Sequence, residues 1–227
     1  MKKMVKVLSL GGSVIVPDEI NYDFLLKFRE FIVEYSKKEK IVIVCGGGKT
    51  ARRYINALEK RKVDHKILNY IGIRITRLNA WFLINFFKGE CAHRPAKSLK
   101  EVKNLLSKNN IVIVGALRYK PNTTSDGTAA DIAKILKTNF INITKVKGLY
   151  DKNPELKGAK LIRKISFDDI YQLIKKIKYK PGMNFVLDPL AAKTVMDHKI
   201  KTYIIGPDLK NLKKLLEGKK FVGTVIS

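Results

Sequence analysis

The chain of 227 residues has few of the side chains that form covalent cross-links or metal centres. Its only cysteines, Cys45 and Cys91, form no Cys-x-x-Cys pair, which excludes a disulfide framework and a cysteine zinc site. Free cysteines are usually buried, so both are expected in the core. His65, His93 and His198 lack the spacing and acidic neighbours of a metal cluster, so we expect no metal site made of protein ligands.

Long hydrophobic stretches are also absent. No segment approaches the ~18 uncharged apolar residues that a membrane-spanning helix needs. The start, MKKMVKVLSLGG, has neither the apolar segment nor the cleavage site of a signal peptide. These absences predict a cytoplasmic protein with no membrane partner. Because 45% of the 227 residues are hydrophobic, the chain can bury one sizeable core, and we expect a single domain over residues 1–227.

Acidic residues are scarce as well. The chain has 46 Lys and Arg but 20 Asp and Glu, giving a formal net charge of +26, which invites a nucleic-acid interpretation. However, 37 of the basic residues are lysines and only 9 are arginines, and the lysines are spread along the helical segments. Proteins that bind nucleic acids usually add Arg for forked phosphate contacts or aromatic residues for stacking. We therefore interpret the charge as a solvated surface and expect no dedicated nucleic-acid partner.

The chain does contain a repeated alternation of short apolar runs and helical patterns. The runs lie at residues 5–10, 41–45, 111–115, 140–144 and 201–206. Runs of β-branched residues that alternate with amphipathic helices indicate a mainly parallel sheet covered on both faces, so the fold class is α/β. Residues 150–174 read as a loop, a strand and a helix, and are expected to form a smaller lobe.

Two glycine-rich loops follow the first two apolar runs, at residues 11–13 and 46–50. The second loop looks like a Walker phosphate loop, but the glycine required five residues before Gly48 is replaced by Ile43. Glycine has no Cβ to obstruct contact between backbone N–H groups and phosphate oxygens, so both loops still predict phosphate binding. Tight turns between strand and helix are the alternative interpretation.

Two further polar loops, residues 115–126 and 144–150, follow the third and fourth runs. Ligands of an open parallel sheet sit beyond the carboxyl ends of its strands, so all four loops are expected at one edge. Arg52 lies one helical turn after the second glycine loop, where it either reaches the same phosphate or faces solvent.

Helix starts are indicated at two more places. Ser125 or Asp126 is expected to cap a helix whose remaining N–H groups can bind a second anion. Asp188 precedes a proline that fits a first helical turn, which predicts a capping role, and Lys193 is expected at the surface.

Six segments share their order and spacing with a known family. The chain resembles the archaeal-type uridylate (UMP) kinases of the amino acid kinase family over nearly its whole length, through GGSVIVP, VCGGGKTARRYI, IGIRITRLNA, DGTAADIA, TKVKGLYDKNP and DPLAAKTV. The resemblance implies a three-layer αβα sandwich with a central, mainly parallel sheet of about eight strands. It implies transfer of the ATP γ-phosphate to UMP with Mg²⁺ as cofactor, in a homohexamer. The acceptor side would belong to the N-terminal half and the ATP side to the C-terminal half.

The resemblance also implies roles for residues at matching positions. ATP contacts are implied for Gly12, Ser13, Gly48, Arg52, Thr144, Tyr150 and Asn153. UMP contacts are implied for Gly47, Asn69, Asn122, Thr123, Thr124 and Ser125. Asp188 matches an acid near the reacting phosphates, a catalytic residue that orients cationic groups. A Mg²⁺ held mainly by phosphates and water leaves no ligand cluster in the sequence.

Several positions depart from the family pattern, most of them on the acceptor side. Asn69 stands where an aspartate is usual, and residues 115–126 replace a Gly-Gly-Thr-His-Pro-Gly-His loop. Arg118 and Lys120 in this loop are cations that can replace lost phosphate contacts, unless they are merely exposed. The remaining departures are Ser9, in place of a lysine or an acid, and Lys147 and Asn153, in place of aspartates.

Two alternatives stay open. The first is a related kinase of another small acceptor. Isopentenyl phosphate kinases usually carry a histidine just after the second glycine loop, but residues 49–53 contain none. N-acetylglutamate and carbamate kinases generally keep the lysine that Ser9 replaces. The second is a degenerate nucleotide-binding regulator, against which the retained glycine loops, Arg52 and Asp188 argue.

Overall fold

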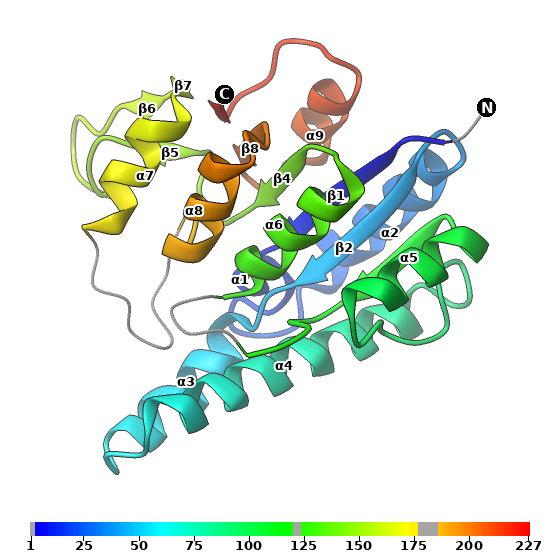
Figure 1. Cartoon of the computed structure of the whole chain (residues 1–227), viewed down its shortest axis with the longest axis horizontal. Helices are drawn as coiled ribbons and strands as arrows, with labels where there is room; N and C mark the ends of the chain where they lie inside the picture. Colours follow the sequence, from blue (N-terminus) through cyan, green and yellow to red (C-terminus); the bar gives the residue numbers. More distant parts are fainter. Residues whose placement is uncertain (1–2, 120–123, 177–185) are drawn as a thin grey trace.

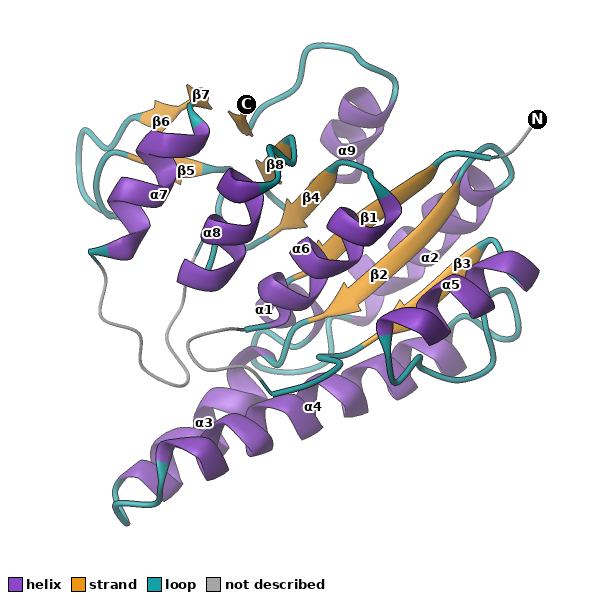
Figure 2. Ribbon diagram, viewed as in Figure 1, coloured by secondary structure: helices purple, strands orange, loops and turns teal. Residues whose placement is uncertain are grey.

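The computed structural model describes residues 3–119, 124–176 and 186–227. Helices and strands alternate along most of the chain (Figures 1 and 2). The strands are β1 (Val5–Leu10), β2 (Lys40–Cys45), β3 (Ile111–Val114), β4 (Phe140–Ile143), β5 (Leu149–Tyr150), β6 (Leu161–Ile162), β7 (Lys164–Ile165), β8 (Thr202–Ile205) and β9 (Thr224–Ile226). The helices are α1 (Gly12–Ile15), α2 (Tyr22–Ser36), α3 (Gly48–Glu59), α4 (His65–Phe86), α5 (Leu99–Lys108), α6 (Ser125–Leu136), α7 (Phe167–Lys175), α8 (Pro189–Asp197) and α9 (Leu209–Leu216).

The main sheet has the strand order β3-β2-β1-β4-β8-β9-β7. Every neighbouring pair for which the register is given is parallel except β8 with β9, which is antiparallel. The five apolar runs form β1, β2, β3, β4 and β8, as predicted. The described residues supply seven strands to this sheet, against the about eight expected, and β5 and β6 form a separate two-stranded sheet.

Alternating side chains divide the core between the two faces of the sheet. In β2, Ile41 and Ile43 join the cluster under α2, α4 and α9, whereas Val42 and Val44 join the cluster under α5, α6 and α8. The strands are therefore apolar on both faces, which is why they read as continuous runs in the sequence. The result is the predicted three-layer αβα sandwich (Figure 2).

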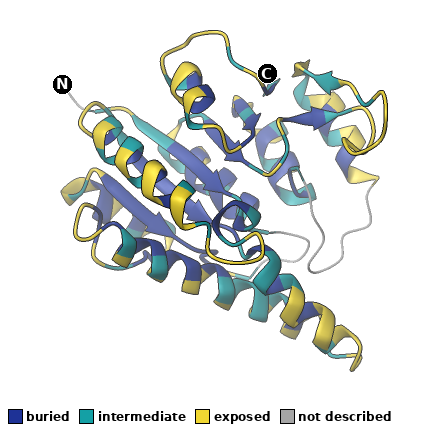
Figure 3. Cartoon of the chain, turned by 180° about the vertical axis from the view of Figure 1, so that it is seen from behind, coloured by how far each residue is buried: buried dark blue, intermediate teal, exposed yellow. Residues whose placement is uncertain are grey.

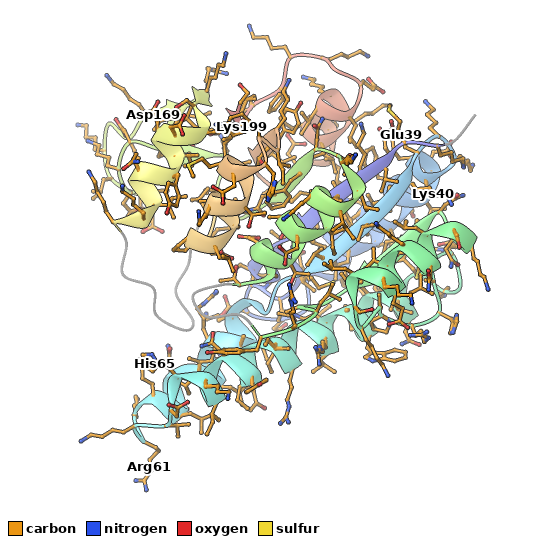
Figure 4. All side chains as sticks on the ribbon, in the orientation of Figure 1. Glu39, Lys40, Arg61, His65, Asp169 and Lys199 are labelled. Atoms are coloured by element: carbon orange, nitrogen blue, oxygen red, sulfur yellow. The ribbon has the colours of Figure 1, made fainter. Side chains whose placement is uncertain are left out.

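Helices α3 and α4 form an arm that extends beyond the sheet (Figure 1). Its own small core contains the buried residues Ala51, Ile55 and Leu68. Arg61 and His65 lie at the tip, far from the strands (Figure 4), where exposed residues predominate (Figure 3). The other end of α4 packs on the sheet, so this helix connects the arm to the central layer.

A smaller lobe follows β4 and contains β5, β6, β7 and α7 (Figure 1). It is continuous with the main sheet because β7 pairs with β9. Helix α5 and strand β9 are elements that the sequence pattern did not reveal. Cys45 and Cys91 are buried, as predicted. Among the helices of the described residues, none combines the length and the apolar character needed to span a membrane.

Candidate active site

The two glycine loops meet backbone to backbone at the carboxyl ends of β1 and β2. A Cβ added to Gly12 would lie 1.9 Å from the amide nitrogen of Gly48 and 2.6 Å from the carbonyl carbon of Gly46. Gly48 also has a φ of +66°, a backbone conformation that other residues rarely adopt. Glycine is therefore required on both sides of this contact. The close approach of the two loops explains why these positions are glycine, whereas a tight turn alone would not explain both.

Hydrogen bonding of the sheet stops where the loops begin. The N–H groups of Gly11 and Gly46 still donate to the carbonyls of Ile143 and Leu10, each at 2.9 Å. Beyond them are four N–H groups that donate to no acceptor in the part of the chain that the structure describes: those of Gly12, Ser13, Gly47 and Gly48. Free N–H groups at the carboxyl edge of a parallel sheet suit an anion such as a phosphate.

Arg52 places a cation beside the first glycine loop. Its Nη2 atom donates to the hydroxyl of Ser13 at 3.2 Å, and partial burial lowers the pKa of the guanidinium. Lys49 forms an ion pair with Asp18 instead, so its side chain is engaged outside this cluster. Arg52 is therefore partly buried beside the first glycine loop and does not simply face solvent.

Asp188 joins the starts of two helices. Its Oδ1 atom accepts from the N–H of Ala191 at 2.7 Å and so caps α8, as predicted. Its Oδ2 atom accepts from the N–H and the hydroxyl of Thr124, both at 2.8 Å, and from the N–H of Gly127 at 3.1 Å. The carboxylate is fully buried, and its negative charge is favourable beside two positive helix ends.

The N-terminal cap of α6 is Thr124, whose hydroxyl accepts from the N–H of Asp126 at 3.2 Å. The sequence-based expectation that Ser125 or Asp126 would cap this helix was therefore wrong. The physical reason is that Asp126 turns inward, away from the backbone N–H groups of its own helix. Its Oδ1 atom accepts from the hydroxyl of Ser9 at 2.8 Å, across the interface between α6 and the sheet.

Asp126 belongs to a buried polar cluster with Ser9 and Asn142. Ser9 on β1 and Asn142 on β4 are register partners, and the Asn142 amide lies 3.5 Å from Oδ2 of Asp126. Burial, and after it the nearby charge of Asp188, raise the pKa of Asp126, whereas the hydrogen bonds from Ser9 and Asn142 lower it, and the net result is a pKa of about 7. A carboxyl group that titrates near neutral pH thus lies directly beneath the loops.

Helix α4 fixes the loop that follows β3. The Thr76 hydroxyl accepts from the N–H of Ala116 at 2.9 Å, and Arg77 donates to the carbonyls of Ala116 and Leu117 at 3.0 and 2.7 Å. The side chain of Asn79 donates to the carbonyl of Gly46 at 2.7 Å. One helix therefore positions both the second glycine loop and the loop after β3.

The remaining predicted residues lie around this centre. Asn69 is on α4, one turn from the part that touches Gly47, and its amide donates to the carbonyl of His65 at 2.7 Å. Thr144 follows β4, and its N–H donates to the carbonyl of Ile205 at 2.9 Å. Tyr150 lies in β5, and the exposed Asn153 accepts from the N–H of Glu155 at 3.1 Å in the smaller lobe. The positions outside the described residues are Lys120, Asn122 and Thr123.

The structure thus brings Gly12, Ser13, Gly47, Gly48 and Arg52 into one group, and Thr124, Ser125 and Asp188 into a second group at the start of α6 and α8. Tyr150 and Asn153 belong to the separate β5–β6 region. Lys193 pairs with Asp197 at the surface, as predicted, and Arg118 is exposed at a cavity beside the start of α5.

Sequence reasoning missed the buried cluster and the α4 contacts. A polar residue inside an apolar strand was the available signal, since Ser9 interrupts VLSL and Asn142 interrupts FINI. Thr76 and Arg77 carried no comparable signal, because polar residues on a helix are ordinary. No group of three or more His, Cys, Asp or Glu side chains within residues 3–119, 124–176 and 186–227 is placed to hold a metal ion.

Comparisons with known proteins agree with this geometry. The model of the amino acid kinase family matches residues 4–206. Uridylate kinase of Thermoplasma volcanium is 38% identical over 222 residues, which are 97% of this chain and 96% of that protein. Uridylate kinase of Archaeoglobus fulgidus is 34% identical over 226 residues, 99% of this chain and 100% of that protein.

Solved structures give the same result for the fold. A crystal structure of uridylate kinase from Archaeoglobus fulgidus superposes with a TM-score of 0.84 at 34% identity, covering 100% of both chains. UMP kinase of Bacillus anthracis has a TM-score of 0.78 at 18% identity, covering 100% of this chain and 97% of the other, and shares the fold.

Proposed function

The chain belongs to the amino acid kinase family, and on that premise we propose that it is a UMP kinase, which transfers the γ-phosphate of ATP to UMP. The observation that carries the proposal is the contact between Gly12 and Gly48, which places free N–H groups of two loops beside Arg52. The names of the relatives support UMP as the acceptor. The products are UDP and ADP, and the reaction is a step of pyrimidine nucleotide synthesis.

Phosphoryl transfer needs two anionic substrates held head to head, with their charge neutralised. In our proposal Gly12, Ser13 and Gly48 donate N–H hydrogen bonds to ATP phosphates, and Gly47 donates to the phosphate of UMP. A phosphate oxygen of UMP attacks the γ-phosphorus, and the bond from that phosphorus to the β-γ bridging oxygen breaks as ADP leaves. Arg52 stabilises the negative charge that is shared among the phosphates during transfer.

The acidic residues act by positioning in this proposal. Asp188 holds Thr124, the N-cap of α6, and Gly127 of α6 against the start of α8. Asp126 holds α6 on β1 through Ser9. Thr144, Tyr150 and Asn153 follow β4 on the ATP side, where the proposal assigns them to the adenosine.

We propose that Mg²⁺ enters with ATP and is held by phosphate oxygens and water, which are the ligands this ion prefers. The described residues offer no cluster that would hold it alone, and both oxygens of Asp188 accept hydrogen bonds. When bound, the ion neutralises phosphate charge. The chain's own contribution is the orientation given by the glycine N–H groups and Arg52.

The proposal includes a homohexamer. Leu78 and Trp81 on α4 are 61% and 48% exposed, and Tyr22 and Leu26 on the neighbouring α2 are 59% and 36% exposed. Tyr22 packs edge-on against Phe86 of α4 at a ring distance of 5.5 Å, so exposed apolar side chains of both helices contribute to the surface where α2 and α4 meet. Such a surface is typical of an interface between subunits. Light scattering after gel filtration is expected to give six times the chain mass; a monomer would contradict this part.

An acceptor screen tests the activity. The purified protein is incubated with ATP and Mg²⁺ and, separately, with UMP, CMP, AMP, GMP or isopentenyl phosphate, and the products are separated by ion-exchange chromatography. We expect UDP and ADP in equal amounts with UMP and slower or no turnover with the others. Turnover of a different acceptor without UDP would establish the related kinase, and ATP binding without any turnover would establish the regulator.

A further inference from the structure

The loop after β3 runs back along α4 toward the start of that helix. A Cβ on Gly115 would lie 2.6 Å from the backbone nitrogen of Arg77, and Thr76 and Arg77 hydrogen-bond residues 116 and 117. Two residues later, the ring of Tyr119 lies against the ring of Tyr70, with centroids 5.3 Å apart and planes tilted by 31°. The loop is thus attached to α4 at both ends of its described part.

This aromatic pair, Tyr70 and Tyr119, lies close to the place where α4 meets the second glycine loop. A Cβ on Gly47 would lie 3.8 Å from the carbonyl oxygen of Gly72 and 3.7 Å from Cγ2 of Thr76. Tyr70 precedes Thr76 by six residues, or about 9 Å along the helix axis. A nucleoside monophosphate is long enough to span this separation, with its phosphate at Gly47 and its base at the two rings.

The pair has the properties of a stacking surface. Tyr70 is 42% exposed and Tyr119 is half-buried, so part of each ring remains open. Single exposed aromatic rings are ordinary, but exposed rings that lie together can mark a binding surface. Stacking of a base on an aromatic side chain contributes roughly 1–3 kcal/mol, and it requires a flat ring, which an aliphatic phosphate does not have.

We propose that Tyr70 and Tyr119 stack against the nucleobase of the acceptor and so select a nucleotide over phosphates that have no base. This inference rests on the proposed function and adds the specificity-determining residues to it. Asn69 precedes Tyr70 on α4, one position farther from Gly72 and Thr76, the residues of this helix that lie next to Gly47. In this arrangement the second glycine loop holds the phosphate, α4 lines the sugar, and the two rings hold the base.

The test compares ring removal with ring retention. Tyr70→Leu and Tyr119→Leu remove the aromatic ring, whereas Tyr70→Phe and Tyr119→Phe keep it and delete only the hydroxyl. We expect each Leu variant to raise the KM for UMP about 5- to 150-fold, the range that corresponds to the stacking energy, with the KM for ATP unchanged. The Phe variants are expected to stay within about 3-fold of the original protein.

Ribose 5-phosphate is the discriminating acceptor because it has the sugar and phosphate of UMP but no base. We expect its turnover or its inhibition constant against UMP to be the same in the Leu variants as in the original protein. Tyr54→Leu is the matched control, because Tyr54 lies on α3 and is 58% exposed. This variant should leave the kinetic constants for UMP and for ribose 5-phosphate unchanged. Circular dichroism and thermal unfolding identify a variant that fails to fold, and the second Leu variant then provides the comparison.

The possible failures are distinguishable. If the original protein forms UDP but the Leu variants keep its KM for UMP, the stacking role is wrong while the proposed function stands. Equal losses for UMP and ribose 5-phosphate would mean that the rings only shape the loop, which also overturns the inference. If the original protein neither binds nor phosphorylates any nucleoside monophosphate, both proposals fall together.

Discussion

The backbone of Gly12 lies so close to that of Gly48 that a Cβ on Gly12 would stand 1.9 Å from the Gly48 nitrogen. No side-chain rotation relieves such a contact, because both partners are main chain. We predict that Gly12→Ala moves the two glycine loops apart and lowers kcat/KM by at least about 100-fold, since misplaced phosphate groups lose the geometry of transfer. Steady-state kinetics with ATP and UMP measure this loss.

Gly72→Ala is the matched control for stability. A Cβ at Gly72 meets only Cδ1 of Ile55, at 3.6 Å, and the residue lies inside α4. Alanine there is expected to maintain or raise the free energy of unfolding, by up to about 1 kcal/mol, because glycine is a poor helix former. If Gly12→Ala had the same small effect on unfolding and left kcat/KM intact, the interlocked loops would be unimportant.

Asp188→Asn tests the link between the two helices. The amide oxygen can still cap α8, but the amide nitrogen cannot accept hydrogen bonds from Thr124 and Gly127. We expect the free energy of unfolding, measured in urea, to fall by roughly 2–4 kcal/mol, because buried N–H groups lose the carboxylate oxygen that accepts from them. Asp208→Asn is the control, because Asp208 caps α9 at an exposed position and Asn caps a helix equally well. This variant should change the free energy of unfolding by less than about 0.5 kcal/mol.

Asp126 makes stability depend on pH in a defined direction. Its pKa is raised from 3.8 to about 7 in the folded chain. Between these values the folded protein holds a proton that the unfolded chain has released, so the stabilisation is complete below pH 3.8 and is lost as the pH rises through 7. Relative to Asp126→Asn, the original protein should lose roughly 1–3 kcal/mol of unfolding free energy between pH 5 and pH 8. Parallel pH curves for the two proteins would refute the assignment.

Arg52→Lys tests whether the guanidinium binds phosphate. Lysine keeps the charge but loses the planar donor fork that contacts Ser13, so we expect the KM for ATP to rise about 10-fold with little change in unfolding. Arg53→Lys is the neighbouring control, because Arg53 is exposed and, among the residues that the structure describes, forms an ion pair only with Asp18, at 3.7 Å. Similar kinetics for both variants would place Arg52 outside the ATP site.

The sequence predicted the sheet well because its strands are buried on both faces and consist of β-branched residues, as in IVIVC and IVIV. The loops at the strand ends followed from topology alone, since parallel strands end at one edge. The direction of Asp126 could not be predicted in this way. Its position suits a helix cap, and only the packing of α6 on β1 shows that Ser9 and Asn142 turn its carboxyl inward.

Asp188 also has a consequence for the order in which the chain is made. A ribosome delivers β1, β2, β3 and α6 well before residue 188, so a nascent chain that ends earlier has α6 without the carboxylate that accepts from Thr124 and Gly127. The first half of the chain contains both glycine loops, but it lacks the residue that secures the start of α6. A chain truncated before residue 188 therefore lacks the carboxylate that joins the starts of α6 and α8.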